Sequence, residues 1–308
     1  MIGIVILNYK TPNDVPPCVD SIREHTREPY RVYVVDNASP DGSFETLSKR
    51  YAGDPDVVIL ESGENGGFSF GNNFGFRRAV SDGCDLILST NSDVVFYDGA
   101  IDRLAARLRE EPDCAVAGPL VRLPDGEIQR YNRGILTARV FLARRKFLSH
   151  FFRQGQVRAY EYADYDFKGK LYPAGMVSCC CFLIRGSALQ EIGYLDEYPF
   201  LYHEEDILGA KLRVGGWKVV LDPSAEVLHY GGKSTGGISP FVRYHMLRSG
   251  LYYLRRYSDT TPAAFRRTAR ILLFFFRLTA VKDKSYRPYY RKLRDDVRDM
   301  NRMGKITL

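Results

Sequence analysis

In the stretch LILSTNSDVVF, residues 86–96, polar residues interrupt an otherwise apolar, β-prone run. The aliphatic residues on both sides of the break predict a buried strand. Asn91-Ser92-Asp93 forms the break and places a carboxylate where a buried strand would continue. Since an unpaired buried carboxylate is costly to desolvate, Asp93 either lies at a strand end facing solvent or faces a metal or ligand that compensates its charge.

Similar apolar runs alternate with helical patterns through about the first 120 residues. The runs predicted to be strands are IGIVILNY (2–9), YRVYVVD (30–36) and DVVILES (56–62), in addition to the stretch at 86–96. Strands and helices that alternate at short intervals predict an α/β domain with a doubly wound, mostly parallel sheet.

Polar clusters follow these strands: Asn8-Tyr9, Asp36-Asn37, Asn65-Gly66-Gly67 and Asn91-Ser92-Asp93. In such sheets, ligands bind beyond the carboxyl ends of the strands. We therefore expect the four clusters to converge on one cleft and Asp93 to be a cleft residue.

The pattern is less regular from about residue 120 to 235. PLVRLPDGEIQRY (119–131) predicts a hairpin with an Asp-Gly turn, and residues 139–154, basic and aromatic, predict a helix or a mobile lid. Residues 172–197 predict a strand, a helix and a turn. Residues 199–223 predict an acidic helix start, a Gly-Gly stop and another strand.

The composition indicates an ordinary globular protein, with 308 residues, 45% hydrophobic and 26% charged. No apolar run approaches the ~18 residues needed to span a bilayer, and the N-terminus lacks the basic start of a secretory signal. Six cysteines show no zinc-type spacing, and Cys179–Cys181 lie in a predicted buried strand. These features predict a reduced, cytoplasmic protein.

Positive charge is concentrated near the C-terminus. Residues 240–308 hold 17 Lys and Arg against 5 Asp and Glu, or +12, whereas residues 1–239 hold 27 against 32, or −5. This asymmetry predicts an anionic surface as partner, either a membrane or nucleic acid.

Three clusters could carry chemistry: Asp93, the run His203–Asp206 (HEED), and His229 at a strand end. A divalent metal could bind Asp93, His229 and the oxygens of a bound diphosphate. Glu204, Glu205 or Asp206 could act as a general base, because crowded like charges raise at least one carboxyl pKa. Taken singly, each cluster also fits a structural role: a helix start favoured by the macrodipole, a strand-end histidine or a turn.

The order and spacing of these motifs resemble the family 2 glycosyltransferases, which have the GT-A fold, over residues 1 to about 235. The stretches that carry the resemblance are VILNYKT (5–11), VVDNASPDGS (34–43), NGGFSFGNNFG (65–75) and STNSDVVF (89–96). Asn91 replaces the first acid of the family's metal-binding DXD motif, whereas Asp93 keeps the second. The resemblance implies a donor site formed by Asn8, Tyr9, Asp36, Asn37, Phe68, Asn72, Asn73, Asn91 and Ser92, with Asp93 as a ligand of Mn²⁺ or Mg²⁺.

FLYHEEDILGAKLRVGGWKVVLDPSAEVLHYGGKST (200–235) resembles the family's second signature. Aligned without gaps through Leu208 and Lys211, Glu205 stands where the family's catalytic Asp lies, and a one-residue shift selects Asp206. His229 corresponds to a histidine that helps to hold metal or diphosphate in some members. Tyr202 and Trp217 could stack on acceptor sugars or pack in the core.

The resemblance is closest to the rhamnosyltransferase and galactofuranosyltransferase-like branch of bacterial surface polysaccharide synthesis. It implies inverting transfer from dTDP-rhamnose or a UDP-sugar to a glycan, which would be lipid-linked. We expect a nucleotide-sugar-binding half (1–120), an acceptor-binding and catalytic half (121–238) and a basic helical tail (239–308). Two alternatives remain open: a sugar nucleotidyltransferase, which should carry a Gly-rich basic loop after the first strand, and a non-catalytic sugar- or membrane-binding adaptor.

The tail contains AFRRTARILLFFFRL (264–278), which predicts a basic amphipathic helix. Arg266, Arg267, Arg270 and Arg277 share one side, and Phe265, Ala269, Leu272 and Phe276 the other. This pattern favours the anionic inner face of the plasma membrane over nucleic acid, because the apolar stripe exceeds what phosphate contact requires. The alternative is a helix packed on the catalytic domain with its basic side in solvent.

Overall fold

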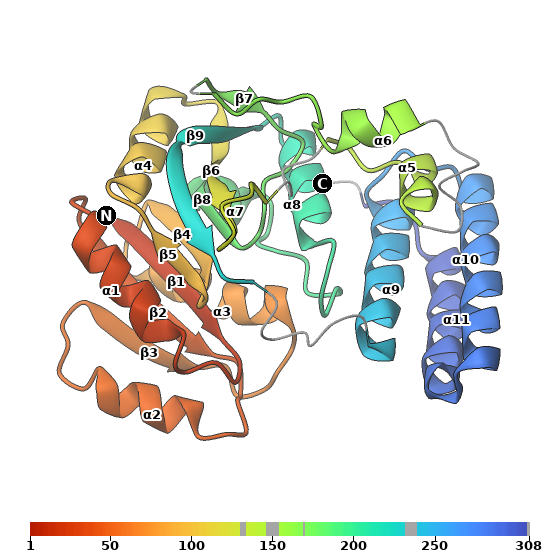
Figure 1. The fold of residues 1–308 in the computed structure, drawn as a ribbon, viewed down its shortest axis with the longest axis horizontal. Helices are drawn as coiled ribbons and strands as arrows, with labels where there is room; N and C mark the ends of the chain where they lie inside the picture. The colour runs from red at the N-terminus through yellow and green to blue at the C-terminus, as the bar shows by residue number, and fades with distance from the viewer. Residues whose placement is uncertain (130–133, 146–153, 169, 232–238, 307–308) are drawn as a thin grey trace.

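The computed structural model describes residues 1–129, 134–145, 154–168, 170–231 and 239–306. A nine-stranded sheet runs through the molecule in the order β3-β2-β1-β4-β8-β6-β9-β5, with β7 paired to β9 (Figure 1). The predicted α/β class with a doubly wound sheet is confirmed. Residues from both sides of position 120 contribute strands to this one sheet.

The first four strands are parallel, so their carboxyl ends meet at one edge. They are β1 (Ile2–Asn8), β2 (Tyr30–Asp36), β3 (Val57–Glu61) and β4 (Leu86–Asn91). Their side chains alternate between the two faces, so that Ile4 and Ile6 enter one apolar cluster and Val5 enters the other. Burial on both faces explains why these strands are continuous apolar runs.

Helices cover both faces of the sheet. One face packs against α1 (Val15–His25), α2 (Ser43–Arg50) and α4 (Ala100–Glu110). The other packs against α3 (Phe68–Ser81), α7 (Gly186–Glu191) and α8 (Glu204–Val214).

The second half of the sheet is mixed. Its strands are β5 (Val94–Phe96), β6 (Cys114–Arg122), β7 (Tyr172–Pro173), β8 (Cys181–Arg185) and β9 (Lys218–His229). β8 is antiparallel to β4 and β6, whereas β6 and β9 are parallel. The stretch at 86–96 divides at its polar break: β4 stays beside β1, and β5 pairs antiparallel with β9, with Val94 opposite His229.

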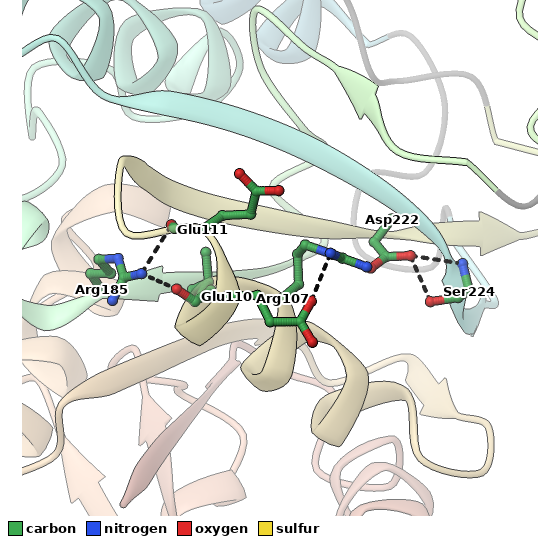
Figure 2. Close-up of polar contacts among 7 residues, drawn as sticks. Arg107, Glu110, Glu111, Arg185, Asp222 and Ser224 are labelled. Atoms are coloured by element: carbon green, nitrogen blue, oxygen red, sulfur yellow. Dashed lines mark hydrogen bonds and ion pairs between the residues drawn. The ribbon is translucent and has the colours of Figure 1, made fainter.

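Two arginines join α4 to the strands of this second half (Figure 2). Arg185 donates to the carbonyls of Leu108 and Glu111 at the end of α4, where a cation is favoured by the helix dipole. Arg107 Nε lies 3.1 Å from Asp222 Oδ2, and Ser224 Oγ donates to Asp222 Oδ1 at 2.6 Å. These contacts hold α4 against β8 and β9.

The predicted hairpin after β6 is short. Gly126 N donates to the Leu123 carbonyl, and a single bridge pairs Arg122 with Ile128. In the segment expected to be a helix or lid, α5 (Ala138–Ala143) is helical, and residues 146–153 lie outside the described residues. A second short helix, α6 (Gln154–Tyr160), follows.

The basic tail forms a helical layer beside the sheet domain (Figure 1). Its helices are α9 (Pro240–Arg256), α10 (Pro262–Lys282) and α11 (Arg287–Arg302), with the short η2 (Lys284–Tyr286) before α11. Ser239 and Thr261 cap α9 and α10, each followed by a proline at the first helical position. No helix in the described part of the chain combines the length and the apolarity that a bilayer span requires.

The structure shows which side of α10 packs on the protein. Phe265, Ala269, Leu272 and Phe276 are buried in a cluster that α10 shares with α5, α9 and α11. Arg266, Arg267, Arg270 and Arg277 are exposed. The apolar stripe identified in the sequence therefore packs on the protein and is not available to a membrane.

Candidate active site

The ends of β1, β2 and β4 are joined by hydrogen bonds. Asn8 Nδ2 donates to Asp36 Oδ2 at 2.6 Å, and the Ser39 amide donates to Asp36 Oδ1 at 2.8 Å. Thr11 Oγ1 lies 3.1 Å from Asn8 Oδ1 and 3.0 Å from Ser92 Oγ. The predicted convergence of polar strand ends is therefore present.

Asn37 holds the Asn/Gly-rich loop against this edge. Its Nδ2 donates to Asn65 Oδ1 at 3.0 Å and to the Gly67 carbonyl at 3.1 Å. Directly after the loop, the Phe68 amide donates to the Phe200 carbonyl at 3.0 Å. The loop thus touches the segment that leads into the acidic helix α8.

Asn72 and Asn73 are fully buried and bind the protein's own groups. Asn72 Nδ2 donates to the Phe68 carbonyl at 2.9 Å, and Asn73 Nδ2 donates to Glu197 Oε1 at 2.7 Å. This arrangement gives both residues a part in positioning the loop. Their direct contact with a donor stays a prediction.

Asp93 and His229 form an ion pair at the break between β4 and β5. His229 Nε2 lies 3.2 Å from Asp93 Oδ1, and His229 Nδ1 lies 3.0 Å from Gln129 Oε1. Burial acts to lower the pKa of His229, but the hydrogen bond to Asp93 and contact with Cys180 outweigh it and raise that pKa to about 10. Burial acts to raise the pKa of Asp93, but the hydrogen bond from His229 outweighs it, and the net shift is downward.

The negative charge of Asp93, which lies at the polar break in the strand, is therefore compensated by His229. Sequence reasoning missed Gln129, which lies on the loop after β6, where no local pattern distinguishes it. Among the described residues, no three His, Cys, Asp or Glu side chains converge on a metal position. A carboxylate and an imidazole that meet at one point still fit a divalent cation that completes its shell with phosphate oxygens.

The three acids at the start of α8 have different surroundings. Glu204 is buried, and its Oε1 has no hydrogen-bond partner among the described residues. Burial, followed by the charge of Glu205, raises the pKa of Glu204 well above its usual value. Asp206 Oδ2 lies 2.6 Å from His203 Nδ1, and Tyr160 Oη donates to Asp206 Oδ1 at 3.2 Å.

Glu205 is partly exposed and borders a small apolar cavity lined by Met176 and Val177. The backbone before it is strained, because Tyr202 and His203 have φ values of 71° and 66°. Consecutive left-handed residues other than glycine persist where the surroundings hold them, often at functional sites.

A loop before β8 lies between the acids and the ion pair. The Asn91 amide donates to the Cys180 carbonyl at 2.9 Å. Burial, followed by the charges of Glu205 and Glu204, raises the pKa of Cys179 well above its usual value. Asn91, Cys179–Cys180 and the start of α8 are therefore neighbours, and all six cysteines are free.

The remaining predicted residues divide between the two ends of the sheet. Tyr9 is exposed beside the donor-side strand ends, and Tyr202 directly precedes the acidic cluster. Trp217 precedes β9 at the end opposite His229, where its Nε1 donates to Glu191 Oε2 at 3.2 Å. The structure does not bring Trp217 to the other site residues.

Comparisons with known proteins agree with this geometry. The model of glycosyl transferase family 2 matches residues 3–193. An N-acetylglucosaminyl-diphospho-decaprenol L-rhamnosyltransferase of Mycobacterium tuberculosis is 28% identical over 304 residues, which cover 96% of this chain and 97% of the relative.

Two solved structures share the fold at 15% identity. GalNAc-T7 with UDP, GalNAc and Mn²⁺ superposes with a TM-score of 0.60, covering 87% of this chain and 54% of that one. The mannosyltransferase PcManGT from Pyrobaculum calidifontis, in complex with GDP-Man and Mn²⁺, superposes with a TM-score of 0.56, covering 97% and 85%.

Proposed function

This chain belongs to glycosyl transferase family 2 and is a glycosyltransferase, and we propose that it inverts the anomeric centre of a nucleoside-diphosphate sugar as it transfers the sugar to a lipid-linked glycan. The donor we propose is dTDP-rhamnose, with a UDP-sugar as the alternative, and the pathway is bacterial surface polysaccharide synthesis. The rhamnosyltransferase relative, aligned over nearly its whole length, supports the rhamnose donor and the lipid-linked acceptor.

Glu205 is the general base in this proposal. Glu204 and Asp206 are buried, whereas Glu205 is the partly exposed carboxylate at the start of α8. Glu205 accepts the proton of the acceptor hydroxyl as the hydroxyl oxygen bonds to the anomeric carbon. The bond from that carbon to the diphosphate breaks, and its electron pair leaves with the nucleotide.

Asp93 and His229 would hold a divalent metal together with the donor diphosphate. When bound, Mn²⁺ or Mg²⁺ would stabilise the negative charge of the leaving group. The 3.2 Å separation of the two side chains and the Mn²⁺ in the GalNAc-T7 and PcManGT structures support this assignment. Asn8, Asp36 and Asn37 form the wall on which the nucleotide lies.

A peripheral position at the inner face of the plasma membrane completes the proposal. The exposed side of α10 carries Phe274, Leu278 and Val281, which are 57%, 44% and 67% exposed. The exposed arginines Arg267, Arg270 and Arg277 lie on the same helix. Exposed apolar side chains flanked by cations suit an anionic lipid surface.

The partial exposure of Glu205, between the buried side chains of Glu204 and Asp206, carries the proposal, and a transfer assay tests it. Purified protein is supplied with Mn²⁺, a lipid-diphosphate N-acetylglucosamine acceptor, and either dTDP-rhamnose or a panel of UDP-sugars. We expect one donor to be used, Glu205→Gln to abolish transfer while keeping donor affinity, and Asp206→Asn to retain transfer. A wild-type protein that binds donor without transferring it, and a Glu205→Gln variant with unchanged binding, would instead indicate an adaptor.

A further inference from the structure

Arg145, directly after α5, carries a charge that the described protein does not neutralise. Its side chain is partly buried, and Nε is enclosed without a hydrogen-bond partner among the described residues. Burial, followed by the charges of Arg144 and Arg243, lowers the pKa of Arg145 to about 10, so it remains protonated at neutral pH.

No carboxylate of the described residues pairs with Arg145. No ion pair between described residues involves Arg145, and the residues outside the described ranges include no Asp or Glu. Arg144 is already paired, with Nε 3.1 Å from Glu161 Oε1. The guanidinium of Arg145 lies 4.5 Å from the centre of the Phe141 ring, a contact that offsets only part of the cost of burying a charge.

Arg145 lies close to the acidic cluster. The Phe141 ring, which contacts the guanidinium of Arg145, also packs edge-on against His203, with ring centres 5.5 Å apart. His203 in turn binds Asp206, one residue after Glu205. Three side-chain contacts therefore connect Arg145 to Asp206, and Phe141 belongs to the apolar cluster that α5 shares with the helical layer.

We propose that Arg145, with Arg243 beside it, binds the diphosphate of the acceptor lipid. The inference rests on the proposed transfer to a sugar that is linked to a lipid through diphosphate. One sugar ring separates such a diphosphate from the hydroxyl that Glu205 deprotonates. A planar guanidinium can bind two phosphate oxygens at once, and the anion supplies a negative charge that neutralises Arg145.

Steady-state kinetics with two acceptors test the proposal. One acceptor is the sugar linked through diphosphate to a short polyprenyl chain, and the other is the neutral octyl glycoside of the same sugar. Arg145→Gln should raise KM about tenfold or more for the first acceptor and leave KM for the octyl glycoside unchanged. Arg139→Gln, an exposed arginine of α5, is the matched control and should change neither value.

Equal changes with both acceptors, or no change with either, overturn the proposal. If the wild-type protein transfers sugar to neither acceptor, the proposed function fails, and a binding measurement still decides the fate of the arginine site. Farnesyl diphosphate, added with EDTA to exclude metal-dependent binding, should raise the Tm of the wild-type protein and of Arg139→Gln.

The Tm of Arg145→Met should not respond to farnesyl diphosphate. Arg145→Lys keeps the positive charge but lacks the planar guanidinium, so it should show a smaller Tm shift than the wild type. This variant tests the site if Arg145→Met does not fold. Absence of a shift in the wild-type protein, or shifts of equal size in wild type and variants, overturns the assignment.

Discussion

His203 Nδ1 and Asp206 Oδ2 lie 2.6 Å apart across the first turn of α8, with both side chains at least nine-tenths buried. Tyr160 Oη donates to the other carboxylate oxygen of Asp206, and the Tyr160 ring belongs to the apolar cluster of the helical layer. The same histidine touches Phe141 of α5. Helix α8 therefore begins where the sheet domain meets α5 and the apolar cluster that α5 shares with the basic tail.

Gly250→Ala should disturb this junction. A Cβ at position 250 would lie 2.4 Å from Phe141 Cε2 and 2.8 Å from His203 Nε2, so α9 could not keep its present distance from α5. We expect a loss of about 1–3 kcal/mol of unfolding free energy and a lower kcat with unchanged donor affinity. Gly155→Ala in α6, whose Cβ would meet nothing within 4 Å, is the control. A Gly250→Ala variant with the stability and kcat of wild type would show that α9 does not brace α8.

Gly67→Ala should weaken donor binding. Gly67 has φ of 95°, and its Cβ would lie 2.3 Å from the Phe200 carbonyl oxygen, in the contact between the donor loop and the segment before α8. Gly63→Ala, with φ of 81° and open space around its Cβ, reports a positive-φ backbone cost of about 1–2 kcal/mol without a steric clash. At Gly67, with φ of 95° and ψ of −172°, the backbone itself adds to the cost, because only glycine commonly adopts this conformation. We expect chemical denaturation to give a larger loss for Gly67→Ala, and donor titration a raised Kd for that variant only. Equal effects of the two substitutions would contradict a role for the close approach.

Metal affinity should rise with pH. Since the pKa of His229 is raised to about 10, a metal must displace its proton, and affinity should increase about tenfold per pH unit below that value. His229→Gln should flatten this slope, and Asp93→Asn should abolish binding. Mn²⁺ titrations at several pH values between 6.5 and 9 provide the measurement, and a pH-independent affinity in the wild type would exclude His229 as a ligand.

The ion pair of Asp93 and His229 also predicts how the stability of the metal-free protein depends on pH. The native state holds the His229 proton more tightly than the unfolded state does, so the stabilisation is complete below pH 6.5 and is lost as the pH rises toward 10. Denaturation with EDTA should show this decline in the wild type and a weaker one in His229→Gln.

Replacing the exposed apolar residues of α10 should weaken lipid binding. Phe274→Ser combined with Leu278→Ser removes apolar area without touching the buried stripe, so folding should be unaffected and co-sedimentation with anionic vesicles should fall severalfold. Val214→Ser, an equally exposed apolar position on α8, should bind vesicles like the wild type. Neutral vesicles should bind poorly in all cases, and unchanged sedimentation of the double variant would contradict the proposed surface.

The donor side could be predicted because its signals are local. Asn8, Asp36 and Asn91 each end an apolar strand, and parallel strands carry their ends to the same edge. The fold of this half follows from the same alternation of strands and helices. Because burying an unpaired carboxylate is costly, the sequence also predicted that Asp93, at a strand break, would face solvent or a group that compensates its charge.

Contacts between distant segments could not be predicted. Gln129 meets His229 only because β6 and β9 lie side by side, and no pattern around residue 129 indicates this. Trp217 follows the acidic motif closely in sequence, yet α8 carries it to the far end of β9. For α10, the spacing predicted an amphipathic helix correctly. The sequence does not indicate that the apolar side of this helix packs against α5, α9 and α11.

The pairing of β5 with β9 has a consequence for synthesis of the chain. Asp93 leaves the ribosome early, but its partner His229 belongs to a strand translated long afterwards. Because domains can begin to fold during translation, the nucleotide-facing strands β1–β4 can assemble first on the nascent chain. The paired site at Asp93 forms only when β9 has emerged, so a truncated product that ends before residue 218 would keep its nucleotide-side strands yet lack the His229 half of the ion pair.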